Sequence, residues 1–304
     1  MRTTRRGGSR RGALTLSEER PRSRRRRVLT RAILALFALS LVVAGYLGWQ
    51  GVLRNFGGPR CQATALGNTV DFDPSQTGYA ATITGLAVKR GLPPRAATIA
   101  LATAIQESKL RNLRYGDRDS LGLFQQRPSQ GWGTEEQILD PVHATNAFYD
   151  ALVKIKGYEQ MEITEVAQEV QKSAYPEAYA DHEQEGRILA STISGHSPGG
   201  IGCRLDAADA GDPQALASAL RTELGVAASV KGRTVTVRAK SELQAWNIGG
   251  WAVAKASTHG VTRVRVDDRQ WTRTRDEDGS AWHKASGAAA PRTVTITFAP
   301  AAQS

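Results

Sequence analysis

The chain has 304 residues and a formal net charge of +11 at pH 7. Twelve arginines lie within residues 1–31, against only Glu18 and Glu19, so this stretch carries about +10 and the remainder is nearly neutral. A nucleic-acid-binding protein would need a folded basic surface or stacking aromatic side chains. Neither accompanies the arginine cluster Arg24–Arg27. We therefore expect a basic, disordered tail over residues 1–31 and no nucleic-acid partner.

An uncharged, apolar run follows at residues 32–53. As a helix it would span roughly 33 Å, enough for the hydrocarbon core of a bilayer. Tyr46 and Trp49 near its outer end suit an interfacial aromatic belt, and the preceding arginines predict a cytoplasmic N-terminus. We expect a transmembrane helix here, in a single-pass protein of the cell membrane whose later domains are extracytoplasmic. The competing interpretations are a cleaved signal peptide, of the twin-arginine type given Arg26-Arg27, and a buried core helix.

Cys61 and Cys203 are the only cysteines, and both lie on the side of the run that is expected to be exported. One disulfide closing this long loop is the natural hypothesis for an oxidising compartment. Two free buried thiols are the alternative. Two cysteines so far apart in sequence have no metal-ligand spacing, so we expect no zinc site.

Residues 54–76 are expected to form a linker, and residues 77–204 an all-α domain of about six helices, large enough for its own core. The first helix begins near Thr77 and ends at Gly91-Leu92-Pro93-Pro94. The second carries Glu107. Later helices are predicted from the capping-box spacing of Thr134 and Gln137, from Asp140-Pro141, and from the runs Val166–Ala174 and Glu177–Ile193.

Glu107 stands on or beside the apolar stripe of its helix, three residues after Ala104 and three before Leu110. A carboxylate in that position lies at the rim of the core or faces a cleft. Desolvation beside apolar groups raises the pKa of a carboxyl group, and a protonated carboxylic acid can protonate a leaving oxygen, as in glycosidic cleavage. The alternative is a helix-end glutamate that pairs with a neighbouring basic side chain such as Lys109 or Arg111.

The residues after this helix carry a family resemblance. Glu107-Ser108 followed by Gly122-Leu123-Phe124-Gln125 resembles the Glu-Ser … Gly-Leu-Met-Gln signature of soluble lytic transglycosylases and goose-type lysozymes, in the lysozyme-like superfamily. Asp140-Pro141 and Asn146-Ala147 resemble the helix that follows the signature. The resemblance covers about residues 77–194. Phe124 replaces the usual Met, and the later Ala-Tyr-Asn-Ala-Gly motif gives way to Ser-Ala-Tyr-Pro-Glu-Ala-Tyr over residues 173–179.

The resemblance implies an enzyme that cleaves the glycan strands of peptidoglycan, either a lytic transglycosylase or a muramidase, with Glu107 as general acid. A hydrolase would add a second carboxylate, for which Asp117 and Asp119 are the candidates; ordinary turn residues are the alternative. The candidate substrate-binding residues are Ser108, Gln125, Gln126, Trp132 and Tyr175; loop ordering and core packing are their alternative roles. We expect no metal and no cofactor, and we interpret His143 and His182 as structural.

From residue 205 onward the sequence predicts strands as well as helices, so residues 205–304 are expected to form a small α+β domain. The predicted elements are helices over Pro213–Leu224 and Leu243–Ala256, a strand at Thr234–Val237, a hairpin around Asp267-Asp268 and a last strand at Thr293–Phe298. Without a nucleophile–base pair, phosphate loop or metal cluster, this domain is interpreted as a binding or bracing module whose partner is unknown. Two rivals to the enzyme hypothesis remain: a non-catalytic wall-binding or scaffolding protein with a degenerate lysozyme-like groove, and an unrelated helical signalling ectodomain.

Overall fold

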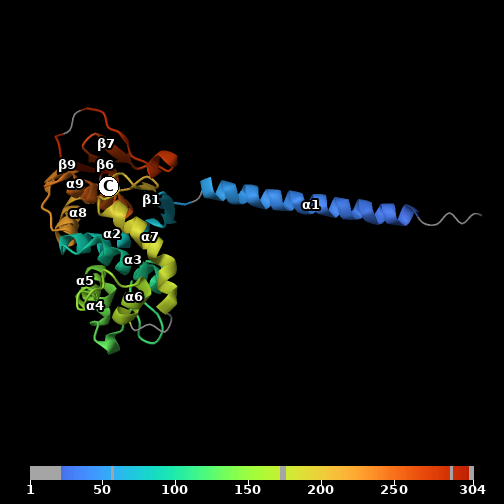
Figure 1. Cartoon of the computed structure of the whole chain (residues 1–304). Helices are drawn as coiled ribbons and strands as arrows, with labels where there is room; N and C mark the ends of the chain where they lie inside the picture. The colour runs from blue at the N-terminus through green and yellow to red at the C-terminus, as the bar shows by residue number, and fades with distance from the viewer. Residues whose placement is uncertain (1–21, 56–57, 172–175, 288–289, 301–304) are drawn as a thin grey trace, which may run out of the picture. The chain divides into compact units, whose positions relative to one another are not determined.

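The computed structural model of the chain describes residues 22–55, 58–171, 176–287 and 290–300 (Figure 1). The chain divides into two units, one within residues 1–57 and one within residues 58–304. The first unit contributes the helix α1, Arg22–Asn55. The second contains all the remaining helices and strands of the described residues.

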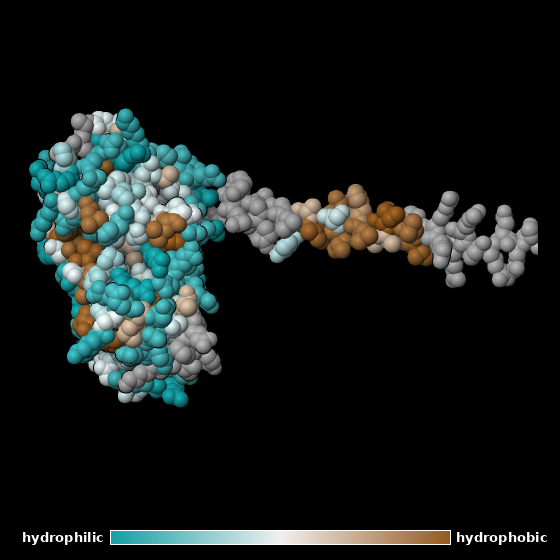
Figure 2. All heavy atoms as spheres, viewed as in Figure 1, coloured by the Kyte–Doolittle hydropathy of each residue, from teal (hydrophilic) through white to brown (hydrophobic). Residues whose placement is uncertain are grey.

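Exposed apolar side chains run along α1 from Val28 to Tyr46. Most of the coloured part of this helix is brown in Figure 2. A helix that crosses a bilayer needs about 20 consecutive, predominantly apolar residues. Among the residues that the structure describes, no helix meets the combined requirement of length and apolarity for a membrane span. The expected transmembrane helix at residues 32–53 is therefore wrong. So is the placement that depends on it, a single-pass membrane protein with a cytoplasmic N-terminus and extracytoplasmic domains.

The second unit mixes helices with two antiparallel sheets. Its helices are α2 (Pro74–Lys89), α3 (Pro94–Ser108), α4 (Glu135–Leu139), α5 (Pro141–Leu152), α6 (Ile163–Gln171), α7 (Glu183–Ile193), α8 (Pro213–Ala219), α9 (Glu242–Ala254) and α10 (Ala256–His259), with short helical turns η1 (Pro128–Gln130), η2 (Pro176–His182), η3 (Leu220–Leu224) and η4 (Glu277–Ser280). Its strands are β1 (Arg60–Ala65), β2 (Asn68–Phe72), β3 (Ile201–Arg204), β4 (Ser229–Lys231), β5 (Thr234–Arg238), β6 (Val261–Val266), β7 (Arg269–Thr272), β8 (His283–Lys284) and β9 (Thr293–Phe298).

The smaller sheet has the order β2-β1-β3 and overturns the expectation of an all-α domain. Strand β3 lies inside residues 77–204, and β1 and β2 occupy the expected linker, residues 54–76. The sheet forms because β1 alternates small buried side chains with half-buried or exposed ones. Leu66-Gly67, with positive φ at both residues, turns the chain back into β2. The fold of this stretch is thus mixed helix and sheet and not purely helical.

A disulfide joins β1 to β3, as the sequence predicts. Cys61 and Cys203 are directly opposed partners in this strand pair and are bonded to each other, across a sequence separation of 142 residues. Both are buried. In the chain-entropy account, closing a loop of that length stabilises the folded state by about 5 kcal/mol. The bond therefore joins the two ends of the helical region, residues 74–193, at one sheet.

Helix α2 lies at the centre of the second unit because its side chains are small. Its inward side chains include Ala80, Ala81 and Ile83, all fully buried. Neighbours pack on several sides: α3, α5 and α7 from the helical region, and η3, α9 and α10 from the C-terminal region, residues 205–304. A single contiguous core therefore extends across both regions.

The larger sheet has the order β4-β5-β9-β6-β7-β8, and every neighbouring pair is antiparallel. The predicted hairpin is present as β6 and β7, and the predicted strands are present as β5 and β9. Alternate side chains of these strands are buried Val, Ile, Trp and Phe. Helices α8, α9 and α10 pack against the sheet, and α9 comes so close that a Cβ on Gly249 would lie 2.5 Å from Val266 Cγ2.

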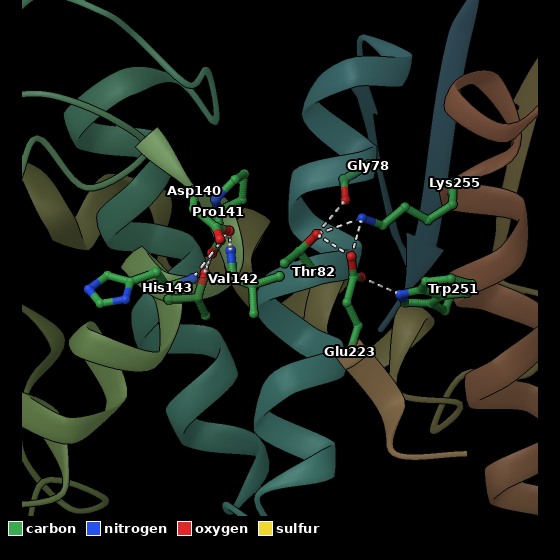
Figure 3. A network of polar contacts seen from close by, with 10 residues as sticks. Gly78, Thr82, Asp140, Pro141, Val142, His143, Glu223, Trp251 and Lys255 are labelled. Carbon is green, nitrogen blue, oxygen red and sulfur yellow. Dashed lines mark hydrogen bonds and ion pairs between the residues drawn. The ribbon is translucent and has the colours of Figure 1, made fainter. Parts of the chain in front are cut away.

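A buried polar network joins α2 to the C-terminal region (Figure 3). Glu223 Oε1 lies 2.8 Å from Lys255 Nζ, and Glu223 Oε2 accepts a 2.7 Å hydrogen bond from the Trp251 indole N–H. Lys255 also donates to Thr82 Oγ1 at 2.6 Å. The ion pair is nearly inaccessible to solvent, with side-chain exposures of 8% for Glu223 and 11% for Lys255. Because one partner comes from η3 and the other follows α9, the network fixes α2 against both.

Candidate functional site

Glu107 lies in the last turn of α3 and is half-buried. The helix begins at Pro94, where the missing N–H of proline costs no intrahelical hydrogen bond. Its inner turns carry buried Ala, Thr, Ile and Leu side chains. The helix ends because Lys109 and Leu110 both adopt positive φ, and the Lys109 N–H donates back to the Ile105 carbonyl. The carboxylate therefore emerges where a rigid, buried helix ends.

Ser108, the next residue, connects the helix to the turn at residues 122–125. Its hydroxyl donates to the carbonyl oxygens of Leu123, at 2.7 Å, and Ala104, at 3.0 Å. It also accepts a 3.2 Å hydrogen bond from the backbone N–H of Arg111. Ser108 is buried, with 5% of its surface exposed. The predicted substrate-binding residue thus makes its described contacts with the protein backbone and holds Glu107 beside the turn.

The turn itself is built from a glycine and a buried aromatic ring. Gly122 has φ of +78°, and a Cβ there would lie 2.7 Å from the Ile138 carbonyl oxygen, so only glycine fits. Phe124 is fully buried and stacks on Phe148 of α5 with ring centroids 4.6 Å apart. The large apolar side chain at position 124 therefore anchors the turn to α5 and does not line a binding surface.

The two predicted glutamine ligands have different surroundings. Gln125, with φ of 48°, is half-buried and donates to the carbonyl oxygens of Gly122 at 3.2 Å and Tyr115 at 3.4 Å, so it orders its own loop. Gln126 is 1% exposed and donates to the Ala144 carbonyl of α5 at 3.2 Å. Its Oε1 has no hydrogen-bond partner among the described residues. Both amides support the loop that faces the end of α3.

Tyr179 touches the candidate acid directly. Its ring is fully buried, and its hydroxyl donates a 2.5 Å hydrogen bond to Glu107 Oε1. The sequence analysis named the nearby Tyr175 as a candidate substrate-binding residue, and Tyr175 lies outside the described residues. The sequence did contain the signal, because residues 173–179 hold a second tyrosine four positions later. The residue that orients the carboxylate is therefore Tyr179.

Helix α7 positions the segment that bears Tyr179 against α3. Gly186 of α7 lets the two helices approach closely, since a Cβ there would lie 2.8 Å from the Thr98 carbonyl oxygen. Glu183, at the start of α7, forms ion pairs with Arg95 of α3 and with Arg187 one turn later. Arg187 Nη2 lies 2.7 Å from Glu183 Oε1. Burial opposes ionisation of Glu183, but the hydrogen bonds from both guanidinium groups outweigh it and lower the pKa of this carboxyl.

The two candidates for a second carboxylate differ in their partners. Asp119 accepts hydrogen bonds from Arg127 Nε at 2.7 Å and from the Ser129 backbone N–H at 2.8 Å. The Arg127 hydrogen bond, followed by those from Ser129, holds the pKa of Asp119 well below its usual range. Asp117 is 91% exposed and lies 3.9 Å from Arg118 Nε. Asp119 is therefore engaged in ordering its loop, whereas Asp117 points toward solvent.

The other predicted site residues lie around this centre. Trp132 is half-buried and packs against the hydrophobic core. His182 Nδ1 lies 2.8 Å from Glu185 Oε2, a local contact across one helical turn. Over the described part of the chain, no cluster of three or more His, Cys, Asp or Glu side chains has a geometry that could hold a metal ion. What the geometry offers chemically is one half-buried carboxylate, oriented by a phenol, at the end of a buried helix.

Comparison with known proteins assigns no function to this site. No protein-family model matches the chain. No curated protein matches it either. The resemblance to lytic transglycosylases therefore rests on the residues themselves, and the function has to be argued from the site.

Proposed function

We propose that this protein cleaves a glycosidic bond in the glycan strands of peptidoglycan, with Glu107 as the proton donor and Tyr179 as the residue that orients it. The observation that carries the proposal is the 2.5 Å hydrogen bond from the Tyr179 hydroxyl to Glu107 Oε1. It ties the glutamate of the Glu-Ser pair to Tyr179, which belongs to the run that takes the place of the later tyrosine motif of the family it resembles. Support also comes from Ser108, which binds the Leu123 carbonyl and so joins the two halves of the signature.

The proposed reaction begins with transfer of the Glu107 proton to the oxygen between N-acetylmuramic acid and N-acetylglucosamine, as the bond from that oxygen to the muramyl anomeric carbon breaks. Glu107 is then a carboxylate and can take the proton of the muramyl 6-hydroxyl. Attack of that oxygen on the anomeric carbon closes a 1,6-anhydro ring and returns the proton to Glu107. No second protein carboxylate is needed, which agrees with the engagement of Asp119 by Arg127.

Plain hydrolysis is the alternative course within the same proposal. Water would attack the anomeric carbon, and a carboxylate on the opposite side would accept its proton. Asp117 is the better candidate for that base because it is exposed and its nearest cation, Arg118, lies 3.9 Å away. The product distinguishes the courses, since hydrolysis leaves a reducing end and transglycosylation leaves an anhydro sugar.

A non-catalytic glycan-binding protein is the second candidate. The observation in its favour is the run at residues 173–179, which lacks the Asn-Ala-Gly turn of the family. Such a protein would bind glycan strands and leave them intact.

The test is digestion of purified peptidoglycan by the full-length chain, with the soluble products identified by mass spectrometry and binding to the insoluble polymer measured in parallel. Anhydro-muropeptides would support the transglycosylase course, and reducing-end muropeptides the hydrolytic one. Binding without any released product would support the second candidate and overturn the enzyme proposal. Absence of both binding and product would overturn both.

A further inference from the structure

The larger sheet has a second face that the apolar core does not use. Pairing of β4, β5, β9, β6 and β7 brings alternate side chains into two rows across the sheet. One row consists of Lys231, Thr234, Thr297, Arg263 and Thr272, and the next of Ser229, Thr236, Thr295, Arg265 and Gln270. These residues, with Arg238 and Thr293 beyond them, are all half-buried or exposed, whereas their neighbours along each strand are predominantly buried apolar residues. We refer to these twelve residues as the outer sheet face.

The charge of the outer sheet face has one sign. Strands β4 to β9 contain no aspartate or glutamate, whereas they contain six lysines and arginines. Four of the six belong to the outer sheet face: Lys231, Arg238, Arg263 and Arg265. Arg265 uses its guanidinium to bind the Ser286 carbonyl oxygen at 3.0 Å and that of Gly287, so it is committed to a loop. Lys231, Arg238 and Arg263 are exposed and offer their charges to solvent.

The spacing of these cations suits an extended ligand. Arg263 and Arg238 are separated by strand β9 and by four residues along the strand direction. With strands about 4.8 Å apart and a rise of about 3.4 Å per residue, their Cα atoms are on the order of 16 Å apart. Half-buried Thr236 and Thr295, whose hydroxyls can both donate and accept hydrogen bonds, lie in the interval. A small anion would contact one cation only, whereas a polymer several sugar units long would reach both.

The side chains of the outer sheet face also select among polyanions. Every member is Ser, Thr, Gln, Lys or Arg, so the face has no aromatic ring on which a nucleobase could stack. It is the face of a sheet and presents no helix for insertion into a DNA groove. Guanidinium groups bind carboxylates bidentately, and hydroxyls bind the hydroxyls of a sugar. We propose that the outer sheet face binds an acidic polysaccharide, a glycan whose sugars carry carboxylate groups, independently of the Glu107 site.

The first experiment measures binding of the full-length chain to an oligogalacturonate of defined length, which carries one carboxylate per sugar. We expect the double variant Arg238→Glu/Arg263→Glu to bind about tenfold more weakly than wild type, because two attractive contacts become repulsive. The matched control is Lys154→Glu/Arg221→Glu, which makes the same change in net charge at two other exposed positions. It should stay within about twofold of wild type, since neither residue belongs to the outer sheet face. The arginines of residues 1–31 are present in every variant, and they contribute equally to each.

The second experiment distinguishes binding at the outer sheet face from binding to the arginines of residues 1–31. A fluorophore attached through Thr236→Cys, in the centre of the outer sheet face, should respond to the oligogalacturonate, whereas one attached through Lys154→Cys should not. The methyl-esterified oligogalacturonate, which lacks the negative charges, should give no response at the concentrations used. An unresponsive label at position 236, or equal losses in the two double variants, would overturn the proposal. Tighter, Arg263-dependent binding of single-stranded poly(dT) would overturn it in favour of a nucleic-acid surface.

Discussion

At the scale of single residues, the hydrogen bond between Tyr179 and Glu107 holds the candidate acid in position. The phenol is buried and has little freedom to move, so it holds the carboxylate oxygen that it binds in place. Replacing Tyr179 by Phe would leave the ring in place and remove this hydrogen bond to the carboxylate. We expect kcat for glycan cleavage to fall about tenfold to hundredfold, the usual weight of a hydrogen bond to a charged group, with KM little changed. Tyr115→Phe, at a ring 73% exposed, is the matched control and should leave kcat unaltered.

His259 makes folding sensitive to pH. Burial, and then the nearby positive charge of Lys255, lower its pKa, and the attraction of Glu223 and Asp212 only partly offsets them. His259 therefore takes up a proton near pH 6.5 in the unfolded chain, and only at lower pH in the folded chain. The contribution of His259 to stability is present above pH 6.5 and is lost as the pH falls through the lowered folded-state pKa. Urea denaturation between pH 7.5 and pH 5 should show this loss in wild type and a flatter profile in His259→Gln. Parallel profiles would contradict the assignment.

Residue roles were only partly accessible from the sequence. The position of Glu107 beside an apolar stripe could be inferred from helical periodicity, and the structure places it half-buried at the end of α3. Periodicity does not tell what a polar side chain at a helix end or in a turn contacts. Ser108 and Gln126 were expected to face a ligand, yet both are buried and bind backbone carbonyls. Tyr179 was not identified because its contact with Glu107 joins residues 72 positions apart.

At the scale of elements, the close approach of α3 and α7 sets the distance between Glu107 and the segment that bears Tyr179. Gly186→Ala would force a Cβ to within 2.8 Å of the Thr98 carbonyl oxygen and 3.0 Å of the Ala102 nitrogen. The helices would have to separate, at a cost of about 1–3 kcal/mol in the free energy of unfolding. Gly78→Ala in α2 is the matched control: its nearest neighbours are 3.8 Å away, so it should be neutral or stabilise by up to about 1 kcal/mol. Equal effects in chemical denaturation would refute the packing argument.

The elements that could be predicted are those with strong side-chain patterns. Helices near α2, α3, α5 and α7 followed from three- and four-residue spacing, and β5, β6, β7 and β9 from alternation of β-branched residues. Strands β1 and β3 were missed for a physical reason: β1 buries only Cys61, Ala63 and Ala65, whose small side chains give a weak apolar alternation. Strand β3 has four residues and pairs with β1 across a long separation, which no local pattern records.

At the scale of the whole molecule, the buried pair Glu223–Lys255 fixes the helical region to the C-terminal region. Lys255→Met would leave the Glu223 carboxylate buried without its cation, and we expect a loss of about 3–5 kcal/mol in the free energy of unfolding. Arg118→Met removes an exposed partner of Asp117 and should cost at most about 1 kcal/mol. Urea denaturation of the two variants gives the comparison. A loss below about 1 kcal/mol in Lys255→Met would show that the network does not brace the two regions.

The arrangement of the two regions could not be predicted from the sequence. A change of character near Leu205 indicated two domains, and the composition of each half gives no hint that one core runs through both. The reason lies in α2, whose small side chains leave room for neighbours from both regions. Gly85 illustrates it: a Cβ there would lie 2.9 Å from Leu224 Cδ2. Close packing of this kind depends on contacts between distant segments and leaves no periodic signal.

The most direct test of the proposed function is the rate at which Glu107→Gln releases soluble fragments from purified peptidoglycan, compared with wild type. Glutamine has nearly the same shape and can still accept the Tyr179 hydrogen bond, but it has no proton to transfer. The proposal predicts a fall in rate of about 10²- to 10⁴-fold with the thermal unfolding curve unchanged. Glu136→Gln, at an exposed glutamate of α4, is the control and should retain the wild-type rate. Release by Glu107→Gln at the wild-type rate would contradict the assignment of Glu107 as the acid.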